Sequence, residues 1–235
     1  MDEQGLTALG VAIPVHNEEQ LLPHCLNAIA RAAAPLPVRV VVALDRCRDG
    51  SADVVAAAAA TGLDVRAVRP DRPGVGAARA AAITALLTDL DPQCTWLAST
   101  DADSVVPADW FVRQLAHAAR GAEMVVGTVR VDDWSEHPPE VRQRYLAGYR
   151  ARAGHRHMHG ANLSFSASAY LSAGGFRARL FDEDVDLIGR FQHDGLPMVW
   201  AADVEVITSA RRTGRAPNGF AQFLTGLQPD LEEVT

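Results

Sequence analysis

The order of apolar runs limits the fold of this chain more than any other feature of its sequence. Short runs of strand type alternate with longer runs of helical type through the first half, and the predicted strands are 9–15, 38–44, 65–68 and 96–100. Helices are predicted between them, at about 18–33, after residue 51 and at 77–90. Alternation of this kind predicts a mostly parallel sheet flanked by helices on both faces, which is an α/β fold.

The second half of the chain is less regular. It predicts strands at 124–131 and 161–166 and helices at 139–153 and 183–192. No internal repeat or low-complexity linker divides the sequence, and 235 residues suffice for one α/β domain with a well-buried core. We therefore predict a single domain over residues 1–235.

Charge and composition exclude several classes of protein. The formal net charge is −7, so general binding to nucleic acids or anionic membranes is disfavoured. All 22 basic residues are arginines. No apolar run is long enough to span a bilayer, and the start MDEQG is unlike a signal peptide. Cys25, Cys47 and Cys94 form no CxxC pair, which is typical of a reducing compartment. We expect a cytoplasmic protein.

Polar loops follow three of the predicted strands, at 14–18, 45–51 and 101–104. In open α/β sheets, ligands bind beyond the carboxyl ends of the strands. We therefore expect the three loops to converge on one edge of the sheet and to form the binding site there.

The strongest local signal is the DxD sequence Asp101-Ala102-Asp103, directly after a hydrophobic strand. Two carboxylates so placed can hold Mg²⁺ or Mn²⁺, which prefer oxygen ligands and commonly bridge to substrate phosphates. The alternative is a polar turn in which an aspartate caps the next helix.

The other two loops carry groups that can hold a nucleotide. The segment 14–19 joins a strand to a helix start whose amides and acids can contact a nucleotide, or in which Asn17 simply caps the helix. The segment 45–53 offers several carboxylates that can accept from the N–H of uracil or guanine, or that form an Asx-rich turn. Two glycines and Arg79 in 74–79 are a weaker signal, and they do not form a dinucleotide-binding GxGxxG.

A cluster of acids opens the predicted helix at 183–192. Four acids lie within the five residues 182–186, and they repel one another. Helix capping accounts for one or two of them, and Asp186 lies one turn from Arg190 as a structural pair. Asp184 is the better candidate for a general base.

These segments together resemble family 2 glycosyltransferases of the GT-A fold, which are inverting and depend on nucleotide sugars. The resemblance covers about 9–227 and rests, in the family's order, on IPVHNEEQLLPHCL, DGSAD, GVGAARAAA, TDADS, GANLSFSASAYLSAGGF and EDVDL. It implies a GT-A-type domain with a Rossmann-like nucleotide-binding half at about 9–104 and an acceptor and catalytic half at about 105–227.

The resemblance also implies roles for individual residues. Those implied for the nucleotide are Pro14, His16, Glu18, Asp45, Asp49, Arg79 and Asp101. Asp103, with Asp101, would hold the divalent cation, Mn²⁺ or Mg²⁺. The loop near the donor sugar and the acceptor would be Gly160, Ala161 and Asn162. Asp184, beside Glu183, would deprotonate the acceptor hydroxyl.

The late part of the sequence departs from the family pattern. Many members carry a histidine as a further metal ligand after a late strand, but the segment 204–212 contains none. Either the metal has fewer protein ligands, or Arg211, Arg212 and Arg215 face the diphosphate, since arginine suits bidentate phosphate contact. His155, His157 and His159 alternate along the chain, which suits either a zinc site or histidines without a metal.

The implied reaction is a single inverting displacement on a nucleoside-diphosphate sugar by an acceptor hydroxyl, assisted by a metal. The sequence identifies neither the acceptor, nor the sugar, nor UDP against GDP. Two alternatives stay open: a sugar-phosphate nucleotidyltransferase, and a nucleotide-sugar-binding relative that has lost catalysis.

Overall fold

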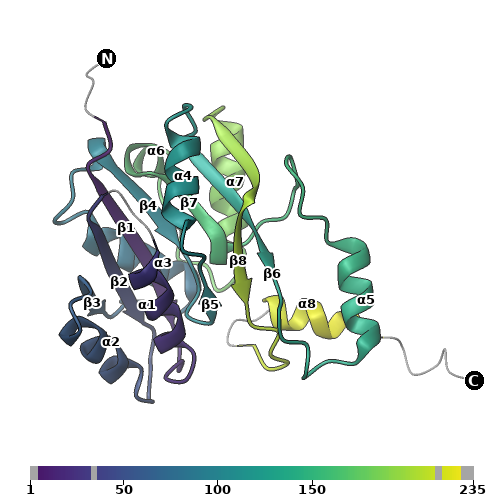
Figure 1. Ribbon diagram of the computed structural model, residues 1–235. Coiled ribbons are helices and arrows are strands. Elements are labelled where there is room, and N and C mark those ends of the chain that lie inside the picture. Colours follow the sequence, from purple (N-terminus) through teal and green to yellow (C-terminus); the bar gives the residue numbers. More distant parts are fainter. Residues whose placement is uncertain (1–4, 33–35, 215–218, 229–235) are drawn as a thin grey trace, which may run out of the picture.

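A computed structural model describes residues 5–32, 36–214 and 219–228 (Figure 1). Its eight-stranded sheet has the order β3-β2-β1-β4-β7-β6-β8-β5. The strands are β1 (Ala8–Val15), β2 (Val38–Leu44), β3 (Val65–Val68), β4 (Thr95–Ser99), β5 (Ser104–Val105), β6 (Met124–Arg130), β7 (Leu163–Ser166) and β8 (Met198–Thr208). The α-helices are α1 (Leu22–Arg31), α2 (Ser51–Ala60), α3 (Val75–Leu86), α4 (Trp110–Ala118), α5 (Pro139–Gly148), α6 (Ala167–Ser172), α7 (Glu183–His193) and α8 (Phe220–Gly226). Short 3₁₀ turns are η1 (Pro92–Cys94) and η2 (Gly160–Asn162).

The sheet changes character at β4. Strands β3, β2, β1 and β4 are parallel to one another, whereas β7 pairs antiparallel with both β4 and β6. Beyond them β6 and β8 are parallel, and β5 adds an antiparallel edge. The α/β prediction is confirmed, with a mixed second half. The DxD aspartates therefore follow the strand at which the parallel half ends.

Helices cover both faces because alternate strand residues point to opposite sides of the sheet. On one face Val11 and Ile13 of β1 pack in a core with residues of α1, α2 and α4. On the other face Ala12 of β1 belongs to a second core with α3, α6 and α7. The second core contains small residues where α3 meets the sheet, such as Ala43 and Ala82, so α3 lies close to the strands.

A third, smaller core lies beyond the sheet, where α5 and α8 pack together away from the parallel strands (Figure 1). It contains the buried residues Tyr145, Ala210 and Leu224, against which Trp134 and Tyr149 pack. This aromatic cluster forms one side of the cavity described below.

Several element boundaries differ from the predictions. The helix expected from about residue 18 begins at Leu22, so Asn17 does not cap it. Asn17 instead has a positive φ of 56°, and its side-chain oxygen accepts from the backbone N–H of Arg48. The helix expected at 139–153 ends at Gly148. Strand β8 and the helices α4, α6 and α8 were not predicted. In the described part of the chain, no helix has both the length and the apolar character needed to cross a bilayer.

Candidate active site

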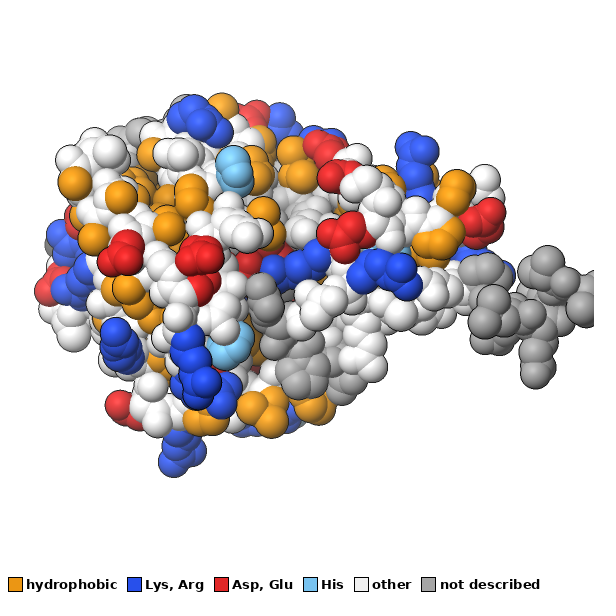
Figure 2. Space-filling view, turned by 90° about the horizontal axis from the view of Figure 1, so that it is seen from below, with side chains coloured by type: hydrophobic (Ala, Val, Ile, Leu, Met, Phe, Trp, Pro, Cys, Tyr) orange, Lys and Arg blue, Asp and Glu red, His pale blue; other side chains and the backbone are white. Residues whose placement is uncertain are grey.

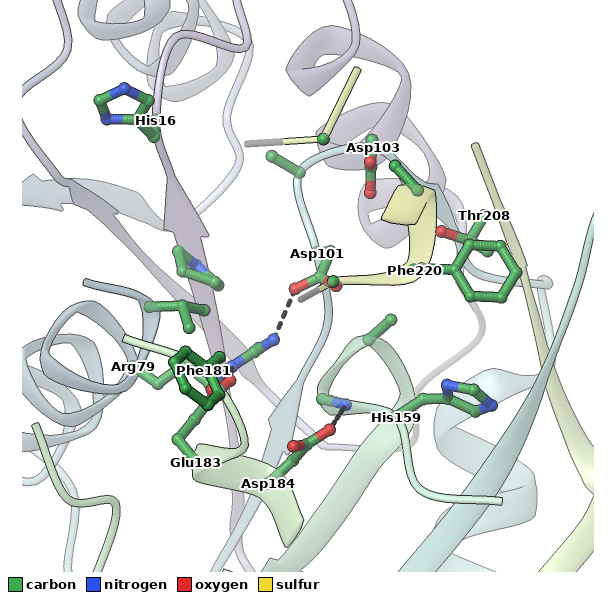
Figure 3. Close-up of a pocket in the computed structure, with 18 of the residues that line it drawn as sticks. His16, Arg79, Asp101, Asp103, His159, Phe181, Glu183, Asp184, Thr208 and Phe220 are labelled. Carbon is green, nitrogen blue, oxygen red and sulfur yellow. Dashed lines mark hydrogen bonds and ion pairs between the residues drawn. The ribbon is translucent and has the colours of Figure 1, made fainter. Parts of the chain in front are cut away.

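A cavity of about 680 Å³ opens beyond the carboxyl ends of β1, β2 and β4 (Figure 3). The predicted convergence of the three polar loops is confirmed, because residues of all three line this cavity, and hydrogen bonds join the first two loops. The backbone carbonyl of Asp45 lies 2.6 Å from His16 Nδ1, and the Ser51 hydroxyl accepts from the backbone N–H of Glu18 at 2.9 Å. The site is therefore built on loops that the parallel strands bring together.

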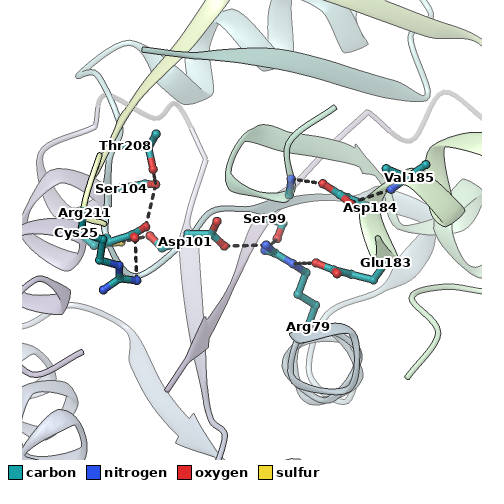
Figure 4. A network of polar contacts seen from close by, with 12 residues as sticks. Cys25, Arg79, Ser99, Asp101, Ser104, Glu183, Asp184, Val185, Thr208 and Arg211 are labelled. Atoms are coloured by element: carbon teal, nitrogen blue, oxygen red, sulfur yellow. Dashed lines mark hydrogen bonds and ion pairs between the residues drawn. The ribbon is translucent and has the colours of Figure 1, made fainter. Parts of the chain in front are cut away.

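Arg79 of α3 is the centre of the polar network under this cavity (Figure 4). Its Nε donates to Glu183 at 2.8 Å, its Nη2 donates to Asp101 at 2.6 Å, and its Nη1 donates to the Ser99 hydroxyl. The side chains of Arg79 and Glu183 are 3% and 5% exposed. Burial raises the pKa of Glu183, and the neighbouring guanidinium of Arg79 opposes that rise. Arg79 thereby joins the end of β4 to the start of α7.

Gly160 makes room for this arginine. A Cβ at Gly160 would lie 2.4 Å from Arg79 Nη2, so a larger residue there would displace the guanidinium. The backbone N–H of Gly160 donates to Asp184 Oδ2 at 2.6 Å, and the backbone N–H of Val185 donates to Asp184 Oδ1 at 2.8 Å. Two backbone donors thus fix the Asp184 carboxylate at the cavity wall (Figure 3).

A second arginine lies at the other end of the DxD sequence. Arg211 donates from both terminal nitrogens to the carboxylate of Glu18, at 2.7 and 2.8 Å, and contacts Asp103 Oδ2 at 2.9 Å. Burial, with the nearby Asp101 carboxylate, raises the pKa of Asp103 to about 7 against the lowering effect of Arg211. The late segment therefore places an arginine beside Asp103.

Asp45 and Asp49 have different surroundings. Asp45 is buried at the cavity wall, and its Oδ2 accepts from the backbone N–H of Gly74 at 2.8 Å. Asp49 is not among the residues that line the cavity, because its carboxylate accepts from Ser51 and from the backbone N–H of Glu19. The carboxylates of both acids are hydrogen-bonded, since Asp45 Oδ1 also accepts from Arg46 Nε at 3.0 Å, but of the two only Asp45 lines the cavity.

Other candidates divide between the cavity and the interior. The cavity lining includes Pro14, His16, Glu18, Gly160 and Ala161. Asn162, by contrast, is buried, and it bonds to Trp110, to the carbonyl of Thr128 and to the carbonyl of Val204. It holds β6, β8 and α4 together instead of lining the cavity. Arg212 is exposed and bonds through its backbone to Glu136, while Arg215 lies outside the described residues.

The two DxD aspartates fit a cation that is shared with a bound phosphate. Asp101 Oδ1 is paired with Arg79 and Asp103 Oδ2 with Arg211, while Asp103 Oδ1 accepts from the Ser104 hydroxyl at 3.5 Å. Mg²⁺ is usually bound through one or two carboxylates and substrate phosphates. Among the described residues no group of three or more His, Cys, Asp or Glu gathers as a complete ligand set. The remaining ligands would therefore come from the diphosphate and water.

An aromatic wall, which the sequence did not predict, lines the opposite side of the cavity. It consists of Tyr149, His157, His159 and Phe220. Tyr149 stacks on His157 with 3.9 Å between ring centroids, and His159 meets Phe220 edge-on at 6.2 Å. The alternating histidines were the one sequence signal for this wall. Their rings stack in a row and, among the described residues, gather no metal-ligand set.

Comparisons with known proteins identify the family. Residues 10–181 match the model of the family described as Glycosyl transferase family 2. A search of curated proteins finds no match. Many solved structures are similar, and they support the predicted GT-A-type fold.

Three of these structures illustrate the range. TarS of S. aureus in complex with UDP has a TM-score of 0.65 and 12% identity, over 87% of this chain and 61% of TarS 1–349. GalNAc-T7 with UDP, GalNAc and Mn²⁺ has a TM-score of 0.65 and 16% identity, over 88% of this chain and 44% of that one. The mannosyltransferase PcManGT from Pyrobaculum calidifontis, with GDP-Man and Mn²⁺, has a TM-score of 0.64 and 20% identity, over 92% and 68%. At these identities the likeness extends to the fold, and this chain spans about three-fifths of the TarS structure, 61%.

Proposed function

Since this chain belongs to glycosyl transferase family 2, as its motifs predicted, we propose that it moves a sugar from a nucleoside-diphosphate sugar to an acceptor hydroxyl with inversion. One observation carries the proposal. Asp184 and the two DxD aspartates line the same cavity, from opposite halves of the chain, and Arg79 ties the two halves together. The proposed general base, Asp184, thereby shares one cavity with the aspartates proposed to hold the leaving diphosphate.

The nucleotide occupies the side formed by the first three loops. The nucleoside lies against Pro14 and His16, and the Asp45 carboxylate accepts from the base. Asp101 faces the ribose and the diphosphate. This orientation follows the usual position of ligands at the carboxyl ends of parallel strands.

The diphosphate lies between Asp103 and Arg211. The guanidinium of Arg211 turns from the Glu18 carboxylate to a phosphate, which presents oxygens at a similar spacing. Four acidic side chains line this region, those of Glu18, Asp101, Asp103 and Glu183, and they outnumber the two guanidiniums that pair with them. The remaining negative charge disfavours a bare diphosphate and favours one that carries Mn²⁺ or Mg²⁺.

The chemistry assigned to this chain is proton transfer and positioning. Asp184 takes the proton of the acceptor hydroxyl while the hydroxyl oxygen attacks the anomeric carbon, and the electron pair of the broken carbon–oxygen bond leaves with the diphosphate. General-base assistance of this kind contributes about 10²- to 10⁴-fold. A bound divalent cation would stabilise the charge of the departing diphosphate. Glu183, which Arg79 holds, positions the start of α7 and so the Asp184 carboxylate.

Thermal-shift and nucleotide-release measurements test the proposal. UDP, GDP and their sugars are titrated into the purified protein with Mn²⁺ or with EDTA, and release of the diphosphate is followed with and without acceptors. We expect a nucleoside diphosphate to stabilise the fold by about 2.7 kcal/mol at a hundredfold excess over Kd, only with the cation. Equal stabilisation in EDTA would contradict the proposed role of the metal in nucleotide binding, but it would not contradict the proposed sugar transfer. Release of pyrophosphate from a nucleoside triphosphate and a sugar phosphate would instead identify a nucleotidyltransferase, and binding without turnover a non-catalytic relative.

A further inference from the structure

Exposed apolar side chains gather at the mouth of the cavity. Seven large hydrophobic residues are exposed in the described part of the chain, and four of them line this cavity: Leu180 (54%), Phe181 (40%), Val185 (39%) and Phe223 (52%). Single exposed apolar residues are ordinary on protein surfaces, whereas a group around one opening indicates a binding site. We name these four residues the apolar rim. Figure 2, which views the molecule from below Figure 1, shows apolar groups interspersed with acidic and basic ones on this face.

The aromatic wall of Tyr149, His157, His159 and Phe220 lines the same cavity, and Figure 3 shows His159 and Phe220 across it from Phe181 of the rim. The Tyr149 ring is supported by Tyr145, which stacks on it at 5.0 Å and 14°. The Tyr149 hydroxyl accepts from the backbone N–H of Val129 at 2.9 Å and is hydrogen-bonded to His159 Nε2 at 3.1 Å. Its polar atom is thus already bonded, and the wall offers a ligand mainly ring faces and edges.

Two members of the wall, His159 and Tyr149, are uncharged at neutral pH. Burial, with the neighbouring imidazoles of His157 and His155, lowers the pKa of His159 to about 3. Burial raises the pKa of Tyr149 to about 12. The ion pairs of the described cavity lining join Arg46, Arg79 and Arg211 to Glu18, Asp45, Asp101, Asp103 and Glu183, and none of them involves a residue of the wall.

Position links the wall to the reaction. His159 directly precedes Gly160, whose backbone N–H binds the Asp184 carboxylate, and Figure 3 shows the His159 side chain and Asp184 on the same side of the cavity. Val185 of the rim directly follows Asp184. A molecule held between rim and wall can therefore present a hydroxyl to Asp184.

We propose that the acceptor is an uncharged alcohol or phenol with an apolar, ring-containing body, bound between the apolar rim and the aromatic wall. This inference rests on the proposed function. A saccharide acceptor would bury several hydroxyls, each of which needs a partner. The wall has few free polar atoms to supply them. Flat apolar bodies match what the wall offers, because ring faces stack and the rim removes the rest of the ligand from water.

Binding of 2-naphthol, followed by its fluorescence without any donor, tests the site independently of transfer. We expect saturable binding that Leu180→Ser and Phe223→Ser each weaken by at least about tenfold, since one lost apolar contact of 1.4 kcal/mol corresponds to that factor. The control is Leu171→Ser on α6, which is equally exposed at 51% and lies outside the cavity lining. Affinity for a nucleoside diphosphate is measured on all variants and stays at the parental value in Phe223→Ser and Leu171→Ser. Leu180 is not held to this criterion, because it packs against Gly74, whose backbone N–H binds Asp45.

Transfer assays then compare 2-naphthol, methyl glucoside and a ring-containing lipid alcohol in phosphatidylcholine vesicles, with each nucleotide sugar. Sugar transfer to 2-naphthol or to the lipid alcohol, lost in the rim variants, supports the inference and distinguishes a free from a membrane-borne acceptor. Transfer to methyl glucoside alone, or binding of 2-naphthol that is absent or unaffected by the rim variants, overturns it while the proposed function stands. If 2-naphthol binds in a rim-dependent way but no donor gives transfer, the apolar binding site is supported and the proposed transferase function is contradicted.

Discussion

Replacing Arg79 tests whether the buried ion pairs hold the two halves of the site together. In Arg79→Met the apolar length of the side chain is kept and the guanidinium is lost, so Glu183, only 5% exposed, has no counter-charge. Breaking a buried pair by removing one partner costs about 3–5 kcal/mol. The Asp101 pair adds less than about 1 kcal/mol, because that carboxylate is 35% exposed and solvent screens it.

The predicted loss is large beside the 5–15 kcal/mol typical of whole domains. It is measured by urea unfolding at pH 7, where the midpoint falls and the slope stays unchanged. The control is the double variant Arg79→Met/Glu183→Gln, whose buried residue is neutral. We expect it to be more stable than Arg79→Met by about 1–3 kcal/mol, because the uncompensated charge is gone.

The pH dependence of Arg79→Met has a definite sign. Burial already raises the pKa of Glu183 in the parent, and loss of Arg79 removes the influence that opposes the rise. The folded state then binds a proton more tightly than the unfolded state, so stability is greatest below the unfolded pKa and falls as pH rises through the folded one. The deficit of Arg79→Met should therefore shrink toward pH 5. A loss below 1 kcal/mol at pH 7, or a double variant no more stable than Arg79→Met, would refute this account of the buried pair.

Three further predictions concern the cavity. Asp184→Asn keeps its size and its affinity for a nucleotide sugar but loses about 10²- to 10⁴-fold in turnover, and near-parental transfer in a single-turnover assay would reject it as the base. Asp103→Ala folds normally, because the residue lies in a loop, and its diphosphate binding loses its dependence on Mn²⁺ in calorimetric titrations; unchanged dependence would mean that Asp103 is not a ligand. His159 has a pKa near 3 in the folded protein, below its ordinary value, so it contributes stability that is lost as pH falls below about 6.5. Below that pH, His159 adds a slope of about 1.4 kcal/mol per pH unit to the free energy of unfolding. This contribution disappears in His159→Gln and persists in the exposed control His24→Gln. Equal slopes in the parent and in His159→Gln would contradict a neutral His159.

The parallel half of the fold was predictable from local sequence because its strands are continuous aliphatic runs. The bounds of β2 and β3 agree with the prediction, β1 begins one residue earlier, and β4 is shifted by one residue at both ends. Strand β8 was missed because polar residues such as Asp203 and Glu205 interrupt its apolar pattern and half of it faces outward. Its partner is β6, far away in sequence, and no local pattern announces such pairing.

The site was predictable to the level of the loops but not of every side chain. Parallel topology alone brings the three loops together, whatever their detailed conformations. Which acid of the segment 45–53 faces the cavity depends on the bond from Gly74 to Asp45, made from a different loop. The cost of the acidic cluster at 182–186 was also overestimated from sequence, because Asp186 contacts Arg177, Arg179 and Arg190. The pair with Arg190 was predicted from helix spacing, whereas Arg177 and Arg179 precede the helix, so their contacts with Asp186 could not be counted from it.

Because the sequence contains no lysine, every Lys-or-Arg position in the site is an arginine. A buried lysine can lose its proton when its partner is removed, whereas arginine stays charged at all ordinary pH values. Arg79 and Arg211 therefore hold fixed positive charges against Glu18, Asp101, Asp103 and Glu183. Because those positive charges cannot be titrated away, any change of charge within this group of side chains has to come from the carboxylates, and Asp103, with a pKa of about 7, is the one placed to take up a proton near neutral pH.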